Sequence, residues 1–342
     1  MSSSKLIYWF EEVGKEYNDV VGKKCANLGE MLRMGLPVPP GFALTLDIYK
    51  KFLTDTGVGE KISSYIGECG DLKSRGIDVF DKVSQNLRAI VENQKMPSSV
   101  GDEIASYYEQ MCKKFKTPNM AVAVRSAGTA SRPGMFETYL NVKGTDEVLD
   151  KVKIVWASTF TPRAIAFRCN KDMPVDCDIL GIAVIKMVNA KAAGIGFTVD
   201  PITGDNSKVI IEANWGLGEG VVSGEENVDR WVVEKKDWKI VERAIGNKVK
   251  QVINKEKGAE WAEVPLEKRL KPCLTDGEIK WVAKVAKLIE DRLGAPQDME
   301  WAVDPDFPAE RNIFLLQTRP AKVAAKKSAT ELLAEMIASR YR

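Results

Sequence analysis

The chain has 342 residues, of which 44% are hydrophobic and 29% charged, and its formal net charge is +2 at pH 7. This length allows two or three compact units, and the near-neutral charge argues against binding to nucleic acid or an acidic membrane surface. The sequence contains no histidine. Because histidine is the usual general base near neutral pH, any chemistry here must use other side chains or a histidine of another molecule.

The N-terminal segment and the cysteines indicate a cytoplasmic protein. The opening MSSSKLIYWFEEVGKEY lacks the apolar core of a secretion signal, and no stretch approaches 18 consecutive apolar residues. The six cysteines form no CxxC pair. We therefore expect reduced thiols, no zinc site and no membrane span.

The N-terminal half is expected to be mainly helical. A first short helix should end at Gly35, because glycine commonly follows the last helical residue and the prolines of LPVPPG cannot continue a helix. The other elements expected here, in chain order, are a strand at 42–45, a helix at 47–53, mostly helix over 57–117 with interruptions near 70–76 and 96–99, a strand at 122–125, and a helix over 147–168 broken at Pro162.

The C-terminal half is expected to be richer in strands. The elements expected here are strands at 179–188, 194–199 and 209–213, a glycine-rich turn at WGLGEGVVSG, a hairpin of 230–235 with 238–241, strands at 298–303 and 313–317, and a solvated helix or tail over 322–342. This order predicts an α+β protein with mixed sheets instead of a regular parallel βαβ array.

The clearest helix is expected from Thr275 to Leu293. Thr275 and Glu278 have the spacing of a capping box, and Gly294 follows as a stop. An apolar stripe at helical spacing runs through Ile279, Val282, Ala283, Ala286, Ile289 and Leu293.

A loop of small residues follows Arg125 in AVRSAGTASRPGMFET. Small residues at Gly128 and Thr129 let an anion approach the backbone amides while the arginine clamps it, which predicts an anion-binding nest. The alternative is a plain turn.

Two lysines, Lys23 and Lys24, lie in a glycine-flanked turn before a helix in VGKKCANLG. Lys24 is placed to reach a phosphate as a point charge, although the GxxxxGK[ST] spacing of a Walker A loop is missing. The alternative is an ordinary solvated helix start.

The apolar run ILGIAVIKMV ends in Lys186, Met187 and Val188. Such a strand can pair its backbone with an adenine edge while the methionine and valine cover the ring. The alternative is a core strand without a ligand.

Polar and charged side chains share one face on each of the last two expected strands. Asp298 and Glu300 share one face of their strand, and Gln317 and Arg319 share one face of the next. Two neighbouring carboxylates repel each other, and a Mg²⁺ ion bridging to phosphate oxygens would relieve that repulsion. The alternative is a solvated sheet face with scattered charges.

Taken together and in order, these motifs resemble a known family. The segments GKKCANLGEM, LPVPPGF, AVRSAGTAS, ETYLNV, TPRAIAFR, GFTVDPITGD, WGLGEGVVSG, DMEW and LLQTRP, spanning roughly residues 8–322, resemble the ATP-binding domain of phosphoenolpyruvate synthase and pyruvate phosphate dikinase. The resemblance implies an ATP-grasp fold with the nucleotide between two lobes. On that basis we expect an N-terminal part over 1–183, a C-terminal part over 184–325 and a tail over 326–342.

The resemblance also implies roles for the matching residues. Phosphate contact and charge stabilisation in catalysis are implied for Lys24, Arg125 and Arg319, and nucleotide contact is implied for Gly128, Thr129 and Arg163. Adenine contact is implied for Lys186, Met187 and Val188. Ribose and metal contact is implied for Asp298 and Glu300, and metal and phosphate contact for Gln317. The family usually has GGKGANL where this chain has GKKCANL, so the choice between Lys23 and Lys24 stays open.

The arrangement of the motifs resembles the stand-alone ATP-binding subunit of phenylphosphate synthase. That resemblance implies ATP and Mg²⁺ as cofactors, cleavage of ATP to AMP and phosphate, and a phosphohistidine-bearing partner subunit that passes the phosphoryl group to phenol. One alternative is a split phosphoenolpyruvate synthase or another dikinase with a different acceptor. A second alternative is a regulatory module that binds ATP without transferring phosphate.

Overall fold

The computed structural model describes residues 5–73, 77–130, 134–222, 227–256, 258–309 and 311–321. The described residues divide into two compact units. Unit 1 lies within Met1–Asn189, Val252–Ala262 and Phe314–Gln317, and unit 2 within Ala190–Gln251, Glu263–Ile313 and Thr318–Arg342. None of the helices in these ranges is both long and apolar enough to span a membrane.

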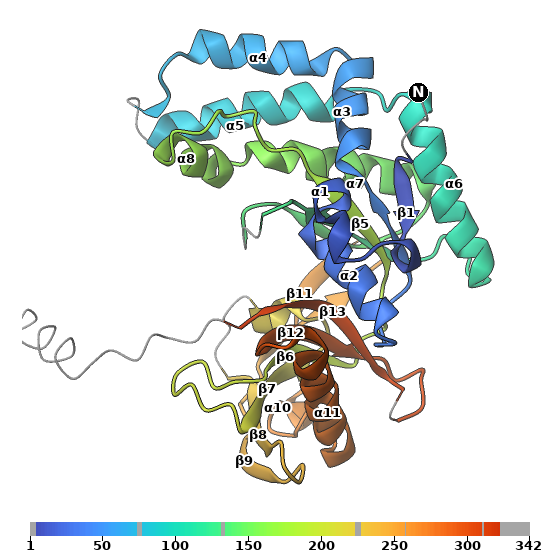
Figure 1. The fold of residues 1–342 in the computed structure, drawn as a ribbon, viewed down its shortest axis with the longest axis vertical. Coiled ribbons are helices and arrows are strands. Elements are labelled where there is room, and N and C mark those ends of the chain that lie inside the picture. Colours follow the sequence, from blue (N-terminus) through green and yellow to red (C-terminus); the bar gives the residue numbers. More distant parts are fainter. Residues whose placement is uncertain are drawn as a thin grey trace, which may run out of the picture. The chain divides into compact units, whose positions relative to one another are not determined.

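Unit 1 is built on a five-stranded sheet with the strand order β1-β2-β5-β3-β4 (Figure 1). The pairs β1–β2, β2–β5, β5–β3 and β3–β4 are antiparallel. The strands are β1 (Ile7–Trp9), β2 (Gly41–Leu44), β3 (Val122–Ala127), β4 (Thr138–Val142) and β5 (Gly181–Lys186).

Helices cover this sheet, and α5 packs against α4, α7 and α8. The helices are α1 (Asn18–Val21), α2 (Lys23–Arg33), α3 (Leu46–Asp55), α4 (Val58–Cys69), α5 (Ile77–Glu92), α6 (Ser98–Lys114), α7 (Thr145–Ala157) and α8 (Pro162–Asn170). In the described residues 3₁₀ turns lie at Phe10–Glu12, Lys15–Tyr17 and Ser158–Phe160.

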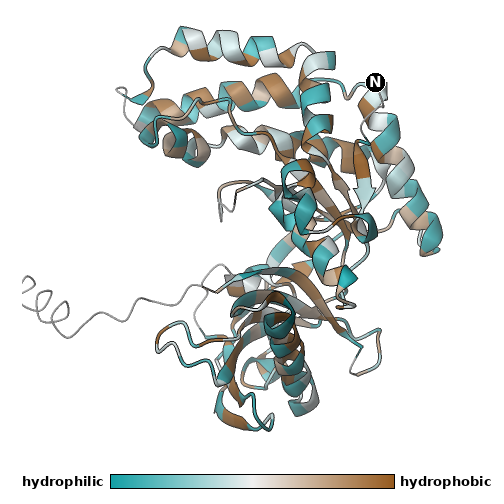
Figure 2. Cartoon of the chain, viewed as in Figure 1, coloured by the Kyte–Doolittle hydropathy of each residue, from teal (hydrophilic) through white to brown (hydrophobic). Residues whose placement is uncertain are grey.

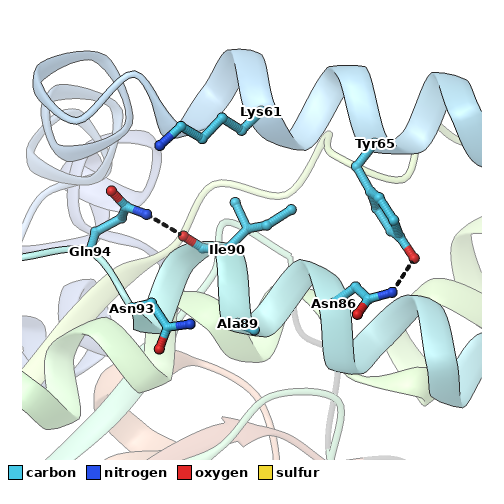
Figure 3. A pocket seen from close by; sticks show the side chains of 7 residues that line it. All are labelled: Lys61, Tyr65, Asn86, Ala89, Ile90, Asn93 and Gln94. Atoms are coloured by element: carbon cyan, nitrogen blue, oxygen red, sulfur yellow. Dashed lines mark hydrogen bonds between the residues drawn. The ribbon is translucent and has the colours of Figure 1, made fainter.

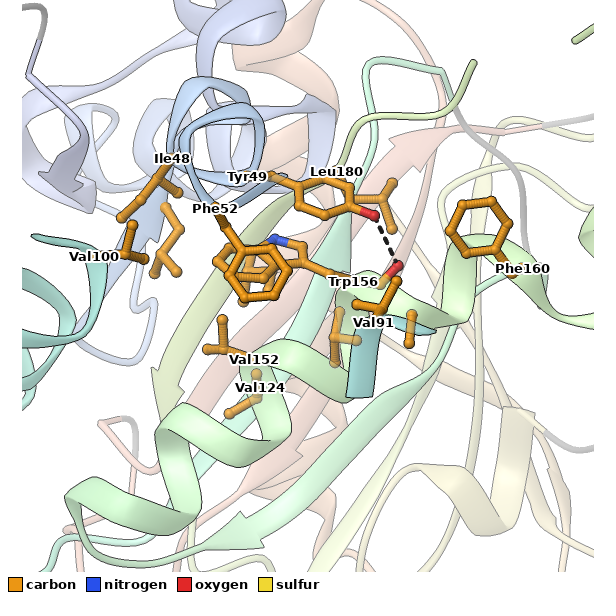
Figure 4. Close-up of a cluster of buried hydrophobic side chains, with 14 of the residues drawn as sticks. Ile48, Tyr49, Phe52, Val91, Val100, Val124, Val152, Trp156, Phe160 and Leu180 are labelled. Carbon is orange, nitrogen blue, oxygen red and sulfur yellow. Dashed lines mark hydrogen bonds between the residues drawn. The ribbon is translucent and has the colours of Figure 1, made fainter. Parts of the chain in front are cut away.

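The core of unit 1 centres on aromatic rings between the helices and the sheet (Figure 4). Trp156 is fully buried and stacks on Tyr49 with ring centroids 5.0 Å apart. Phe52 packs against the same indole at 5.1 Å. In Figure 2 the strands of this sheet are mostly hydrophobic, as expected for a sheet buried beneath helices.

The second large sheet has the strand order β13-β12-β6-β7-β8-β9. Its strands are β6 (Ala192–Phe197), β7 (Lys208–Trp215), β8 (Asp229–Glu234), β9 (Ile240–Ala244), β12 (Gln297–Val303) and β13 (Ile313–Pro320). The remaining elements are the short helices α9 (Glu219–Val222) and α10 (Leu266–Arg269), the long helix α11 (Asp276–Leu293), and a separate two-stranded sheet of β10 (Lys250–Asn254) and β11 (Ala259–Glu263).

Helix α11 packs against β6, β7, β8 and β12, and it forms as its sequence predicts. Thr275 accepts a hydrogen bond from the Glu278 amide, and Glu278 accepts one from the Thr275 amide, which completes the capping box. Gly294 ends the helix in the left-handed conformation with φ 70°. The apolar stripe is buried from Ile279 to Ile289.

Most expected elements are confirmed, including the mixed α and β content and the helix break before Pro162. Three expectations are wrong in detail. The strand expected to reach Val188 ends at Lys186, the second hairpin strand begins at Ile240 instead of Trp238, and WGLGEGVVSG includes the helical turn Glu219–Val222. Trp238 has φ 61°, so it belongs to the turn. The expected tail over 322–342 lies outside the described residues.

Candidate functional site

Arg125 lies on β3, between β5 and the edge strand β4, where it pairs with Ala183 on β5 and Thr138 on β4. Its guanidinium is half-buried and donates hydrogen bonds to the Leu316 carbonyl at 3.2 Å and to Gln317 Oε1 at 3.3 Å. The structure therefore brings together two motifs that are 192 residues apart in the sequence.

The start of α2 packs closely on the loop that follows β3. Gly22 has φ 80°, and a Cβ atom there would lie 2.0 Å from the Ala127 carbonyl oxygen, so only glycine fits. The Lys23 amide donates to the Gly128 carbonyl at 2.9 Å, and Asn18 Nδ2 donates to the Thr129 carbonyl at 3.5 Å. The positive end of the α2 dipole therefore lies beside this loop.

Lys24 and Arg125 both lie close to the buried thiol of Cys25. Burial raises the pKa of this thiol to about 12, while the positive charges of Lys24 and Arg125 oppose the rise. The start of α2, which carries Lys23 and Lys24, thus lies beside Gly128 and Thr129, and a helix N-terminus beside a loop of small residues is suited to an anion.

Arg163 makes a contact that the sequence did not predict. Its side chain is exposed at the start of α8, and its NH1 donates to the Gly134 carbonyl at 2.9 Å. In this structure Arg163 therefore holds the far end of the small-residue loop.

The three residues expected to hold adenine lie where β5 ends. The Lys186 amide donates to the Pro40 carbonyl at 2.8 Å, and the Met187 amide donates to the Ala121 carbonyl at 2.9 Å. Met187 is half-buried and Val188 is buried. An adenine edge at this place would have to pair with backbone groups other than those two amides.

In unit 2 the predicted alternation along β12 and β13 is confirmed. Met299 and Trp301 are buried, while Asp298 and Glu300 lie on the opposite, half-buried face. Arg319 Nε donates to Asp298 Oδ2 at 3.1 Å, and the Asp298 side chain is only 14% exposed. The arginine thus offsets part of the repulsion between the two carboxylates.

The metal ligands expected from the sequence provide only two carboxylates, Asp298 and Glu300, plus the Gln317 amide. Within the described ranges, no three or more Asp, Glu, Cys or His side chains gather in a group that could hold a metal ion. The two carboxylates of β12 are enough for Mg²⁺, because that ion is usually held by one or two carboxylates together with substrate phosphates. Gln317 Oε1 accepts a hydrogen bond from Arg125 and has a second lone pair for a cation.

A groove on unit 1 lies between α4 and α5, away from these residues (Figure 3). Tyr65 and Asn86 face each other across it, with a 2.6 Å hydrogen bond from the Asn86 amide to the Tyr65 hydroxyl. No predicted site residue lines this groove.

Sequence reasoning missed Arg88 and Glu137, which form a bidentate ion pair beside the small-residue loop. Glu137 is the glutamate of the MFET segment, which the sequence analysis quoted without giving it a role. Its partner lies 49 residues earlier on a helix, so no spacing rule connects the two.

Comparisons with known proteins cover nearly the whole chain. A family model described as the pyruvate phosphate dikinase AMP/ATP-binding domain matches residues 18–338. The probable phosphoenolpyruvate synthase of Staphylothermus marinus is 39% identical over 344 residues, covering 92% of this chain and 41% of that protein. The phosphoenolpyruvate synthase of Pyrococcus furiosus is 37% identical over 369 residues, covering 96% of this chain and 45% of that protein.

The chain thus spans less than half the length of these two relatives. Among solved structures, D-alanyl-alanine synthetase A of Vibrio cholerae aligns with 76% of this chain and 64% of its own, at 12% identity and a TM-score of 0.27. That score is too low to support an argument about the fold.

Proposed function

The chain belongs to the family of the pyruvate phosphate dikinase AMP/ATP-binding domain, and from this premise we propose that it is the ATP-binding catalytic subunit of a phosphotransferase with several subunits. In this proposal the chain has an ATP-grasp fold, with ATP between two lobes. ATP is cleaved to AMP and phosphate, and a phosphoryl group passes to a histidine on a partner subunit.

The hydrogen bond between Arg125 and Gln317 is the structural observation that best supports the proposal. It joins the arginine that follows the small-residue loop to the LLQTRP motif, although the two lie 192 residues apart. Two polar side chains that meet in this way can both contact the same phosphate group.

The proposed roles follow from the charges of the side chains. Lys24, Arg125 and Arg319 stabilise negative charge on the transferring phosphoryl group by preorganised electrostatics. Gly128 and Thr129 provide backbone close to the phosphates, and Arg163 supports that loop from its far end. Met187 and Val188 offer apolar surface to the adenine ring, beside the Lys186 backbone.

Mg²⁺ would be held by Asp298, Glu300 and Gln317, where it would add positive charge opposite the phosphates. The Asp298–Arg319 ion pair keeps this carboxylate oriented. Because the chain has no histidine, it cannot form a phosphohistidine itself, and the proposal assigns that group to the partner.

A phenylphosphate synthase-like reaction, with phenol as the final acceptor, is our preferred version. A split phosphoenolpyruvate synthase has equal support from the relatives, which are themselves described as phosphoenolpyruvate synthases. A purely regulatory ATP-binding module is less favoured, because a binder that transfers nothing need not keep the acidic pair and the phosphate-binding groups together.

The purified chain alone should bind ATP in the presence of Mg²⁺ but transfer no phosphate to small acceptors. The charged groups around Gly128 explain the binding, and the zero histidine count explains the lack of transfer. Calorimetry with ATP and chromatographic analysis for phenylphosphate test both parts. Formation of phenylphosphate by the chain alone would contradict the proposed relay, and absence of ATP binding would contradict the proposed site.

Lys24→Ala should weaken turnover and ATP binding much more than Lys23→Ala does. The motif register assigns the phosphate contact to Lys24, and both lysines lie in the first turn of α2, whose start contacts the loop at Gly128. The two variants serve as controls for each other, because they remove the same charge at adjacent positions of α2. A larger effect at Lys23 would mean that the motif is shifted by one residue.

A further inference from the structure

The second half of the small-residue loop is held by an extensive set of polar contacts. We call residues 134–137, which lead into β4, the return arm. The corner between α7 and α8 supplies three contacts to it: Arg163 NH1 donates to the Gly134 carbonyl at 2.9 Å, Thr161 Oγ1 donates to the Met135 carbonyl at 3.1 Å, and Ser158 Oγ accepts from the Glu137 amide at 3.2 Å.

The fourth contact is an ion pair between α5 and the end of the return arm. Arg88 NH1 and NH2 donate to Glu137 Oε1 and Oε2 at 2.5 and 3.0 Å, so the pair is bidentate. The same guanidinium donates from Nε to Glu92 at 3.0 Å, and the Tyr139 hydroxyl donates to Glu137 at 2.5 Å. The Arg88 and Glu137 side chains are only 25% and 28% exposed.

This geometry restrains the carboxylate more firmly than an ordinary surface ion pair would. A bidentate arginine–carboxylate pair fixes orientation as well as distance, and partial burial reduces screening by solvent. Burial, and then the hydrogen bond to Glu137, raise the pKa of the Tyr139 hydroxyl, which therefore remains a donor at neutral pH.

The ion pair lies next to the proposed phosphate-binding arginine in the sheet. Glu137 immediately precedes β4, and Thr138, the next residue, pairs with Arg125 of β3. Movement of the return arm would therefore shift the strand that flanks Arg125. The contacts of Glu137 hold the chain in place immediately before the first residue of this strand.

We propose that Arg88 and Glu137 are positioning residues, which hold the return arm so that Arg125 and the amides near Gly128 stay aligned on the phosphates. Neither residue touches the nucleotide in this proposal. The inference rests on the proposed ATP site, because it concerns the alignment of that site. Positioning matters for phosphate binding because preorganised donors act only at the right distance and angle.

A double-mutant cycle on the purified full chain tests the inference. The variants are Arg88→Met, Glu137→Gln and the double variant, and the measured quantities are the dissociation constants of ATP with Mg²⁺ and of adenosine, both by calorimetry. We expect each single variant to weaken ATP binding by about tenfold, which corresponds to about 1.4 kcal/mol. Adenosine has no phosphates, so its affinity should not change.

The double variant should be no weaker than either single variant, because both substitutions break the same contact. The control is Arg243→Ala, which removes another bidentate pair, with Asp276 at 2.6 Å, on exposed side chains in unit 2. It should leave both affinities unchanged. If Arg88→Met fails to fold, Arg88→Lys retains the charge and should show a smaller loss of ATP affinity in the same direction.

Two results would overturn the positioning role while leaving the ATP site intact: folded variants that bind ATP as tightly as the wild type, or equal losses for ATP and adenosine. Absence of ATP binding by the wild-type chain is a different result. It would remove the proposed site itself, and the positioning role with it.

Discussion

Replacing Arg125 with alanine should lower the rate of phosphoryl transfer, measured with the partner subunit, by roughly 10²–10³. The residue is half-buried on β3, between β5 and β4, and its guanidinium donates hydrogen bonds to the Leu316 carbonyl and to Gln317. The substitution removes a preorganised positive charge without emptying the aromatic core around Trp156. Steady-state kinetics and a thermal unfolding curve separate these effects.

The matched control for this prediction is Lys73→Ala. This variant also removes a positive charge from unit 1. Lys73 forms an ion pair with Asp172 on the surface, where the lysine side chain is 53% exposed and the aspartate side chain 78% exposed. This control should change neither the rate nor the stability appreciably. Glu300→Gln should behave like Arg125→Ala, since both lie on the proposed ligand side. Activity of either variant within about threefold of the wild type would remove that residue from the site.

Replacing Lys248 with methionine should destabilise the protein by about 3–5 kcal/mol, which is the largest stability effect expected here. Lys248 and Asp229 form an ion pair at 2.5 Å, and both side chains are fully buried. Asp229 also accepts hydrogen bonds from the amides of Gly246 at 3.0 Å and Cys273 at 2.8 Å. Without the lysine, the carboxylate remains buried and loses its only positively charged hydrogen-bond donor among the described contacts.

Urea unfolding followed by tryptophan fluorescence measures this loss. Lys236→Met is the control, because it breaks an ion pair with Glu234 in which the lysine side chain is 75% exposed, and its effect should stay within about 0.5 kcal/mol. Adding Asp229→Asn to Lys248→Met should recover part of the loss, because the amide oxygen still accepts a backbone hydrogen bond and carries no charge. An unchanged free energy of unfolding for Lys248→Met would show that the buried pair contributes little.

The sequence predicted those elements whose formation depends only on residues close together in the chain. The capping box of Thr275 and Glu278, with Gly294 as the stop, predicts α11 because every part of the signal lies within that helix or at its ends. The alternation of Met299 and Trp301 with Asp298 and Glu300 likewise requires only the twofold repeat of a strand.

Contacts between distant segments were not predictable in the same way. The apolar run of β5 continues to Val188, yet the strand ends at Lys186, whose amide donates to Pro40, the residue just before β2. Proline accepts the Lys186 hydrogen bond but has no amide to return one, so the ladder stops there. The pairing of Arg88 with Glu137 also depends on how α5 packs, which no short motif encodes.

The roles of the individual site residues remain proposals, because they depend on where a ligand binds. The sequence supplied the residue types and their order, and the resemblance supplied their roles. The structure adds that Arg125 meets Gln317 and that Asp298 meets Arg319, each within its own unit.

The most direct test of the central claim follows the individual phosphates of ATP in the reconstituted pair of subunits. ATP labelled separately at the β- and γ-phosphates is incubated with this chain, a phosphohistidine-bearing partner and the acceptor. The account predicts AMP as the nucleotide product, the β-label on a histidine of the partner and then on the acceptor, and the γ-label in free phosphate. Stoichiometric ADP with the γ-label on the acceptor would contradict it, because that is the outcome of a simple kinase.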